Sequence, residues 1–265
     1  MNYLDSKLFG SVPAPQSFGQ LLDLVEVHAG ERFNVYMWRG QGNLDWAIHS
    51  AAYRRLSKDL GAGEKVTEQK LKYYEERLLR MARHQGYGFE NGHMLSDFEV
   101  LAKLQHHGAA TRLIDCSRNL LVGLWFACKS QPNDVGLLFG IHSENLGGYE
   151  GELENLPYKT VFNESEDDSD SYPQTWQPPV VTKRIAAQGA QFLYSAVCRH
   201  IMGSLAFDKS CDAYIAIALQ PSFKLKMLEL LSGTFDIRQL TLFPDIDGFS
   251  FAHSERFTEH ENDRW

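Results

Sequence analysis

Residues 135–142 read Val-Gly-Leu-Leu-Phe-Gly-Ile-His, an apolar run that no Asp, Glu, Lys or Arg interrupts. Such a run is typical of a strand that is buried on both faces. Residues 213–219 (AYIAIAL) predict a second buried strand, and residues 35–39 (VYMWR) predict a third, which ends at Gly40-Gln41-Gly42. We expect these strands to belong to the β-sheet core of the protein.

Helical patterns occupy much of the sequence around these strands. The expected helices run over residues 17–28, 64–84 and 117–129, from Asp97 to a stop at Gly108, and from Pro221 to a stop at Gly233. Ser96-Asp97-Phe98-Glu99 is a capping box, and Ser117 is a natural N-cap for the helix over 117–129. Helices and strands interleave without a regular βαβ rhythm. The sequence therefore predicts a mixed α/β (α+β) fold, a single domain over residues 1–265 with a split or curved β-sheet core flanked by helices.

The acidic residues are concentrated in one segment. The net charge is -8, yet residues 1–149 hold 16 basic and 16 acidic side chains, whereas residues 150–170 hold eight acidic side chains and one lysine. We expect an acidic loop insertion at 143–179, with residues 150–170 forming a mobile insertion whose deletion would leave the fold intact. The remaining body is close to neutral, so the net charge does not exclude a nucleic-acid partner.

The cysteine pattern and the hydropathy predict a cytoplasmic protein. The four cysteines show no Cys-x-x-Cys spacing, and the N-terminal stretch lacks the basic and apolar regions of a secretory signal. No apolar run approaches 18 residues, so we expect no membrane partner. The cysteines are expected to be reduced and mostly buried.

One segment holds an unusual density of polar groups. Residues 105–115 (QHHGAATRLID) supply an amide, two imidazoles, a hydroxyl, a guanidinium and a carboxylate between two expected helices. Asp115 either caps the second helix or belongs to a site. Arg39, at the end of an expected strand, requires either a carboxylate partner such as Asp115 or Asp45, or an anionic ligand.

Two further patterns resemble metal sites, although we expect no metal. His106 and His107 are adjacent, and adjacent side chains on a helix point about 100° apart, which disfavours a shared ion. Asp245-Ile246-Asp247-Gly248 offers two carboxylates, but it is also typical of a tight turn. A magnesium-dependent nuclease that uses Asp115, Asp245 and Asp247 is therefore kept as an alternative function.

Four blocks in this order resemble the FRG domain family. Their residues are Trp38-Arg39-Gly40-Gln41, the segment from Gln105 to Asp115 that continues into residues 121–127, the run Arg184-Ile-Ala-Ala-Gln188 with Phe192, and residues 242–248 (LFPDIDG). The resemblance spans about residues 30–250. It implies an FRG-type domain, and FRG domains are often encoded near defence or toxin genes.

The order of the blocks also resembles that of ADP-ribosyltransferases of the Arg-Ser-Glu type. This more distant resemblance implies an ADP-ribosyltransferase-like fold and NAD as substrate. The residues that it implies for catalysis are Arg39, Thr111, Asp115 and Gln188. The residues that it implies for NAD binding are Trp38, Arg39, Gly40, Gln41, His106, His107 and Arg112.

One departure from the transferase pattern concerns the late strand. Residues 184–192 (RIAAQGAQF) contain no glutamate, and neither Gln188 nor Gln191 can act as a carboxylate base. The first expectation is a NAD-dependent ADP-ribosyltransferase-like toxin or anti-phage defence effector. It would modify a nucleic-acid or protein acceptor and answer to an antitoxin or another regulatory partner. The alternatives are a non-catalytic module that senses a nucleotide or a phage protein, and the nuclease.

Overall fold

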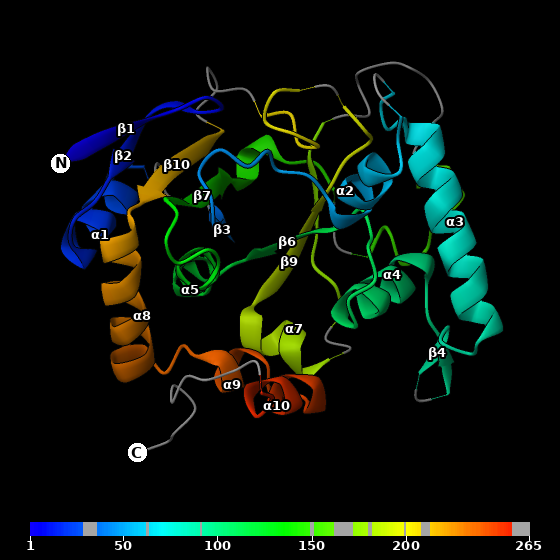
Figure 1. Cartoon of the computed structure of the whole chain (residues 1–265). Helices are drawn as coiled ribbons and strands as arrows, with labels where there is room; N and C mark the ends of the chain where they lie inside the picture. The colour runs from blue at the N-terminus through cyan, green and yellow to red at the C-terminus, as the bar shows by residue number, and fades with distance from the viewer. Residues whose placement is uncertain are drawn as a thin grey trace.

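A computed structural model of the 265-residue chain describes residues 1–28, 36–61, 64–90, 92–148, 151–161, 172–179, 182–198, 200–207 and 213–255. The described core is a six-stranded sheet in the order β10-β7-β3-β6-β9-β8, and every neighbouring pair is antiparallel (Figure 1). Its strands are β3 (Tyr36–Gln41), β6 (Ile114–Ser117), β7 (Gly136–His142), β8 (Gln174–Trp176), β9 (Ala190–Tyr194) and β10 (Tyr214–Leu219). The mixed α/β class is confirmed.

Two small hairpins and ten α-helices accompany the sheet in the described part of the chain. The hairpins pair β1 (Asn2–Ser6) with β2 (Gly10–Ala14) and β4 (Phe89–Glu90) with β5 (His93–Met94). The helices are α1 (Phe18–His28), α2 (Ala51–Lys58), α3 (Glu68–His84), α4 (Asp97–His106), α5 (Leu120–Lys129), α6 (Tyr158–Val161), α7 (Lys183–Gln188), α8 (Pro221–Phe235), α9 (Gln239–Leu242) and α10 (Ile246–Ala252), with a 3₁₀ turn over Ser143–Asn145. None of these helices combines the length and the apolar character needed to cross a bilayer.

Strand β7 is buried on both faces, as its apolar run predicts. All seven of its residues are buried. Phe139 packs in a core cluster with Phe9 of the N-terminal hairpin, whereas Leu138 packs on the opposite face in a cluster with Trp125 of α5 and Met227 of α8. Helices α5 and α8 therefore cover one face of the sheet, and the β1–β2 hairpin lies on the other (Figure 1).

Three of the predicted helix ends are wrong. The helix expected from residue 64 begins at Glu68, after the N-cap Thr67. Ser117 does not cap α5, because it is the last residue of β6, a strand that the sequence pattern did not reveal. The N-cap of α5 is Asn119, whose side chain accepts a hydrogen bond from the Leu121 amide. Gly233 does not end α8, which continues to Phe235 and is followed by Asp236 in the left-handed conformation (φ 54°).

The acidic segment contributes to the core, so its assignment as a loop insertion at 143–179 is in part wrong. Tyr158 of α6 and Trp176 of β8 are almost fully buried in a third cluster around Phe98 of α4. Trp176 Nε1 donates a 2.7 Å hydrogen bond to Glu154 Oε1. The acidic residues from 164 to 170 lie outside the described residues.

Three of the four cysteines match the sequence expectation. Cys116, Cys128 and Cys198 are buried free thiols. Burial raises the pKa of Cys116 and of Cys128 to about 12, so both thiols stay protonated near neutral pH and are poor nucleophiles. Cys211 lies outside the described residues.

Candidate functional site

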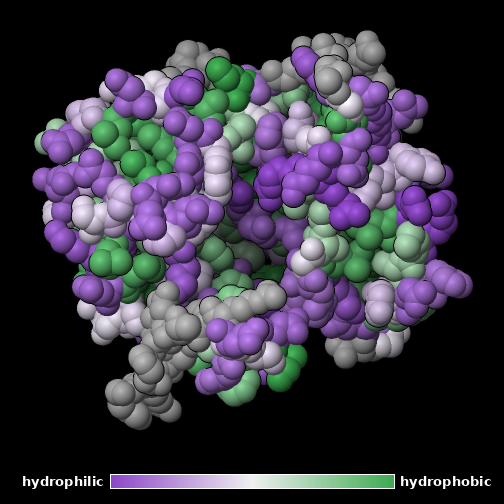
Figure 2. Space-filling view, viewed as in Figure 1, coloured by the Kyte–Doolittle hydropathy of each residue, from purple (hydrophilic) through white to green (hydrophobic). Residues whose placement is uncertain are grey.

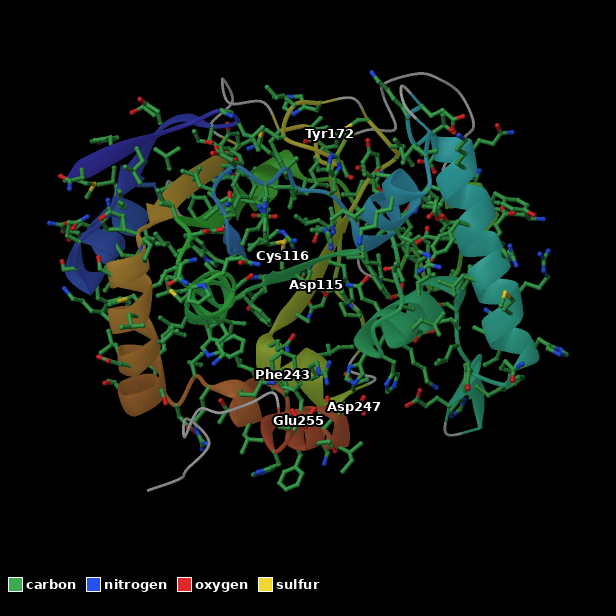
Figure 3. All side chains as sticks on the ribbon, viewed as in Figure 1. Asp115, Cys116, Tyr172, Phe243, Asp247 and Glu255 are labelled. Carbon is green, nitrogen blue, oxygen red and sulfur yellow. The ribbon has the colours of Figure 1, made fainter. Side chains whose placement is uncertain are left out.

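A pocket of about 340 Å³ lies where β3, β6 and β9 meet α5, α4 and α7. Its volume is within the range of small-molecule sites. Figure 3 shows Asp115 and Cys116 near the middle of the molecule on β6, with Phe243 on the side of α9. The lining residues are Trp38, Arg39, Gly40, Ala102, Gln105, His106, Asp115, Cys116, Ser117, Val122, Gly123, Phe126, Arg184, Ile185, Gln188, Ala190, Phe192 and Phe243. The family blocks quoted from the sequence thus meet in one cavity.

Gly40 allows β3 to approach α5 closely enough to form this wall. A Cβ at Gly40 would lie 2.1 Å from the carbonyl oxygen of Gly123 and 2.3 Å from the amide nitrogen of Ala127. Only glycine fits such a contact between two backbones. The close packing of β3 on α5 places Arg39, one residue earlier, at the pocket.

Arg39 is held by neutral groups. Its Nη1 donates a 2.8 Å hydrogen bond to the backbone carbonyl of Asp115, and its Nε donates a 3.3 Å bond to Gln41 Oε1. No carboxylate of the described residues forms an ion pair with Arg39, and Asp45 instead accepts a hydrogen bond from Ser6. The sequence predicts either a carboxylate partner or an anionic ligand for Arg39. Because no described carboxylate pairs with it, the guanidinium is available to an anionic ligand.

Asp115 is the only carboxylate among the described residues that line the pocket. It lies on β6 opposite Phe192 of β9, so the expectation that it caps a helix is wrong. Asp115 is exposed to solvent through the pocket, although many protein atoms lie around its carboxylate. This enclosure raises the pKa of Asp115, while the Arg39 guanidinium and a hydrogen bond from Gln105 lower it in part.

Gln105 and Thr111 form a relay that orients the Asp115 carboxylate. Gln105 Nε2 donates a 2.7 Å hydrogen bond to Asp115 Oδ1, and the Thr111 hydroxyl donates to Gln105 Oε1. The hydroxyl also accepts a bond from the Leu113 amide. Thr111 is fully buried and does not line the pocket, so it can influence the pocket only through Gln105, and its predicted catalytic role stays a prediction.

Arg112, predicted to bind NAD, lies outside the pocket. It is buried and pairs with Glu75 at 2.7 Å and with Glu68 at 2.9 Å, and it also donates to the Tyr158 hydroxyl. These contacts join the segment that precedes β6 to α3 and α6. The carboxylates raise the pKa of Arg112 despite its burial, so the residue is a structural cation.

His106 lines the pocket beside a second arginine. His106 Nε2 lies 3.3 Å from Asp245 Oδ2, and Arg184 binds the same carboxylate through two nitrogens, at 2.7 and 2.9 Å. Arg184 also stacks over the Phe243 ring at 4.7 Å. Burial and the Arg184 charge lower the pKa of His106. The imidazole is therefore neutral near pH 7 and can accept a proton.

His107 and Asp247 lie outside the pocket and form a separate group with His106. The His106 and His107 ring centroids are 4.8 Å apart, so the expectation that the two rings point away from each other is wrong. His107 is the C-cap of α4, where the helical side-chain directions no longer apply. With Asp247, whose Oδ2 is 3.0 Å from His107 Nδ1, the two histidines offer three metal-ligand atoms within 4.8 Å of one another.

The carboxylates of the nuclease alternative do not come together. Asp115 is bound by Gln105, Asp245 by Arg184, and Asp247 by His107. Asp245 is the N-cap of α10 and accepts a bond from the Gly248 amide, which confirms its expected backbone role, although a helix follows it instead of a tight turn. The described residues supply no cluster of these three carboxylates for a magnesium site.

Gln188 and Gln191 differ in their position relative to the pocket. Gln188 lines the pocket at the end of α7, and its Nε2 donates a 3.0 Å bond to the Leu242 carbonyl. Gln191 is buried in β9 and donates to Thr175, so it does not reach the pocket. Trp38, also predicted, lines the pocket with a largely buried ring.

A second pocket of about 620 Å³ shares Arg39, Gly40 and Phe126 with the first. It contains Gln41 from the predicted set, whose Nε2 donates to the Trp46 carbonyl. Its other lining residues are Gly42, Asp45, Trp46, Ala47, His49, Arg54 and Ser130. The two pockets form a two-lobed site with Arg39 at the boundary. Figure 2 shows a hollow near the centre of this face, with hydrophilic side chains on its rim.

Several pocket residues were absent from the sequence-based site. Arg184 and Phe243 are in the quoted family blocks, which was the available signal for them. Gln105 supplies the amide of the polar segment at residues 105–115, but no catalytic or binding role was predicted for it. Arg54 lies on α2, an unpredicted helix, and no local pattern relates it to Arg39.

The comparisons with known proteins identify one family. The family model of the FRG domain matches residues 34–135. No curated protein and no solved structure matches the chain. The matched segment contains Arg39, Gln105, Thr111 and Asp115, whereas Arg184, Gln188 and Phe243 come from beyond it. Residues 34–135 are thus similar to the FRG domain, and the candidate site combines this matched segment with the C-terminal helices.

Proposed function

We propose that the two-lobed site binds NAD as a substrate and that the protein transfers ADP-ribose from it to a macromolecular acceptor. The observation that carries this proposal is that a guanidinium and a carboxylate face the same aromatic pocket. Arg39, which forms no ion pair with a described carboxylate, and Asp115, the one carboxylate among the described lining residues, both face it. This combination suits a substrate with an anionic diphosphate and a sugar that becomes cationic during the reaction.

The smaller lobe is suited to the nicotinamide ribose. Trp38, Phe126 and Phe243 provide apolar ring surface, and Asp115 lies among them as the one negative group of the described lining residues. Arg39, at the boundary of the lobes, would bind the diphosphate, and the larger lobe with Trp46 would hold the adenosine. The aromatic side chains would pack against the two ring systems.

The reaction that this arrangement supports is a displacement at the ribose. The bond between the nicotinamide nitrogen and ribose C1′ breaks, and its electron pair leaves with neutral nicotinamide. The Asp115 carboxylate stabilises the positive charge that develops on the ribose. An acceptor oxygen or nitrogen then bonds to C1′ and loses its proton to Asp115 or to the neutral imidazole of His106.

The missing late glutamate is compatible with this scheme. Asp115 is hydrogen-bonded in register with β9, the strand in which a transferase would carry its glutamate. A carboxylate from the neighbouring strand can therefore reach the same pocket. The cellular role as a toxin or anti-phage effector, and an antitoxin or other regulatory partner, stay predictions from the family resemblance.

The experiment measures nicotinamide release after incubation of the protein with NAD, together with transfer of labelled ADP-ribose to lysate macromolecules. Asp115→Asn and Arg39→Lys should each reduce release by about 100-fold, because one removes the stabilising charge and the other the planar guanidinium. Arg80→Lys, a matched change at an exposed position of α3, should leave release unchanged. Calorimetric binding of NAD without any release would instead favour the sensing module.

A further inference from the structure

A third hollow on the same face continues from the two-lobed site. It has a volume of about 830 Å³ and lies between α2, α3 and the turn at Gly108. Arg54 lines both this groove and the larger lobe, and Arg39 lines both lobes. A continuous path of lining residues thus leads from the groove to Asp115.

The charge of the groove is strongly positive. Arg54, Arg55 and Lys58 come from α2 and Arg77 from α3, whereas Asp59 is its single acidic lining residue. All four cations are exposed, and none forms an ion pair with a described residue. Other cations nearby are neutralised, as Arg112 is by two glutamates. Free cations on both walls of a groove are a site for a chain of negative charges.

The groove also offers ring and apolar surface. Arg55 stacks over Tyr74 at 5.9 Å, and the Tyr74 hydroxyl is fixed by a 2.9 Å hydrogen bond to the Ala110 carbonyl. Guanidinium and aromatic faces stack on nucleic-acid bases, while the free cations contact phosphates. Figure 2 shows hydrophilic side chains gathered over α2 beside the central hollow.

We propose that this groove binds single-stranded nucleic acid and delivers it to the two-lobed site as the acceptor of ADP-ribose. A single strand is favoured over a duplex because a nucleotide must leave the base stack to enter a pocket. The charge distribution agrees with this assignment, because the positive groove stands out on a body close to neutral. The binding part of the proposal is independent of the transfer chemistry, whereas the acceptor part depends on the proposed function.

The test compares two pairs of charge removals in the full chain. The groove variant is Arg55→Gln with Lys58→Gln, which leaves Arg54 and Asp115 intact. The control variant is Lys159→Gln with Lys226→Gln, two exposed lysines on α6 and α8 that line none of the three hollows. Binding of a fluorescent 12-nucleotide single strand is measured over a range of salt concentrations, with thermal melting as the check on folding.

The groove variant should bind about tenfold more weakly than the wild type, and its salt dependence should fall by about 0.7 in slope for each lost phosphate contact. The control variant should bind like the wild type. Equal loss in both variants, no loss in the groove variant, or equally tight binding of a polyglutamate peptide would overturn the proposal.

Two outcomes separate this inference from the proposed function. Nicotinamide release from NAD without oligonucleotide binding would overturn the groove assignment and leave the function supported. Oligonucleotide binding without nicotinamide release would support the groove as a binding site and contradict the transfer. Labelled ADP-ribose on the oligonucleotide, lost in the groove variant and retained in the control, would support both.

Discussion

Gln105 Nε2 donates a 2.7 Å hydrogen bond to Asp115 Oδ1, and this bond links the end of α4 to the strand β6 at the candidate site. The Thr111 hydroxyl donates to the other end of the same amide, so the amide nitrogen faces Asp115. The carboxylate is thereby oriented by a residue that itself has a fixed orientation. Such support of a reactive group by its neighbours is what a preorganised site requires.

Removing this hydrogen bond should change the pH dependence of nicotinamide release. The bond lowers the pKa of Asp115, so Gln105→Ala should raise that pKa further and move the acidic limb of the rate profile to higher pH. Thr111→Val should move the limb in the same direction, because the amide loses its anchor. Thr111→Ser keeps the hydroxyl and should restore the wild-type profile. An unchanged limb in Gln105→Ala would contradict the assignment of Asp115.

Asp115→Asn should make the protein more stable at neutral pH. Enclosure raises the pKa of Asp115 in the folded protein above its unfolded value of about 3.9. The folded protein therefore holds more protons between these two values, and ionisation of Asp115 costs stability as the pH rises through the folded pKa. The melting temperature of Asp115→Asn should exceed that of the wild type at pH 7, and the difference should shrink as the pH falls towards about 4. A difference that is independent of pH would contradict this account.

Arg112→Met should destabilise the fold without altering the pocket. The substitution leaves Glu75, which is fully buried, without its cation. Loss of one member of a buried pair costs about 3–5 kcal/mol in the free energy of unfolding, measured by urea denaturation. Arg80→Met, at an exposed position of α3, serves as the control and should change it by less than about 0.5 kcal/mol. A stable Arg112→Met variant that fails to bind NAD would restore the binding role predicted from the sequence.

Gly40→Ala should separate β3 from α5. The new Cβ would lie 2.1 Å from the Gly123 carbonyl oxygen, and a backbone must move to relieve the contact. We expect a loss of about 1–3 kcal/mol in unfolding free energy, together with weaker NAD binding, because Arg39 moves with β3. Gly61→Ala, where nothing lies within 4 Å of the new Cβ, is the matched control and should be close to neutral. Equal stability of the two variants would argue against the close packing.

The sequence predicted the local features of the fold well. The capping box at Ser96 is present with both of its hydrogen bonds, and the apolar run at 136–142 is a strand buried on both faces. Strand β6 was missed, because its four residues lie in a polar segment and its alternation is too short to stand out. Helix α2 was missed because its single buried residue, Ala52, provides no apolar stripe.

The site was predicted in part. Arg39, Asp115, Gln188, His106 and Trp38 line one pocket, as the family resemblance implied. Thr111 and Arg112 belong to the same sequence block, but both are buried away from the pocket, where Thr111 binds Gln105 and Arg112 pairs with two glutamates. Residue type and order identified the block. The side of the sheet on which Asp115 lies followed from the pairing of β6 with β3 and β9.

By itself, the sequence determined the most apolar strands, the capping box at Ser96 and the polar blocks, because these depend on periodicity and on contacts between near neighbours. The tertiary structure alone decided that no described carboxylate forms an ion pair with Arg39, that Glu75 and Glu68 neutralise Arg112, and that Arg54 connects a positive groove to the pocket. The partner of a charged side chain comes from a distant part of the chain. The residues that remain free to bind a ligand are therefore known only once the chain is folded.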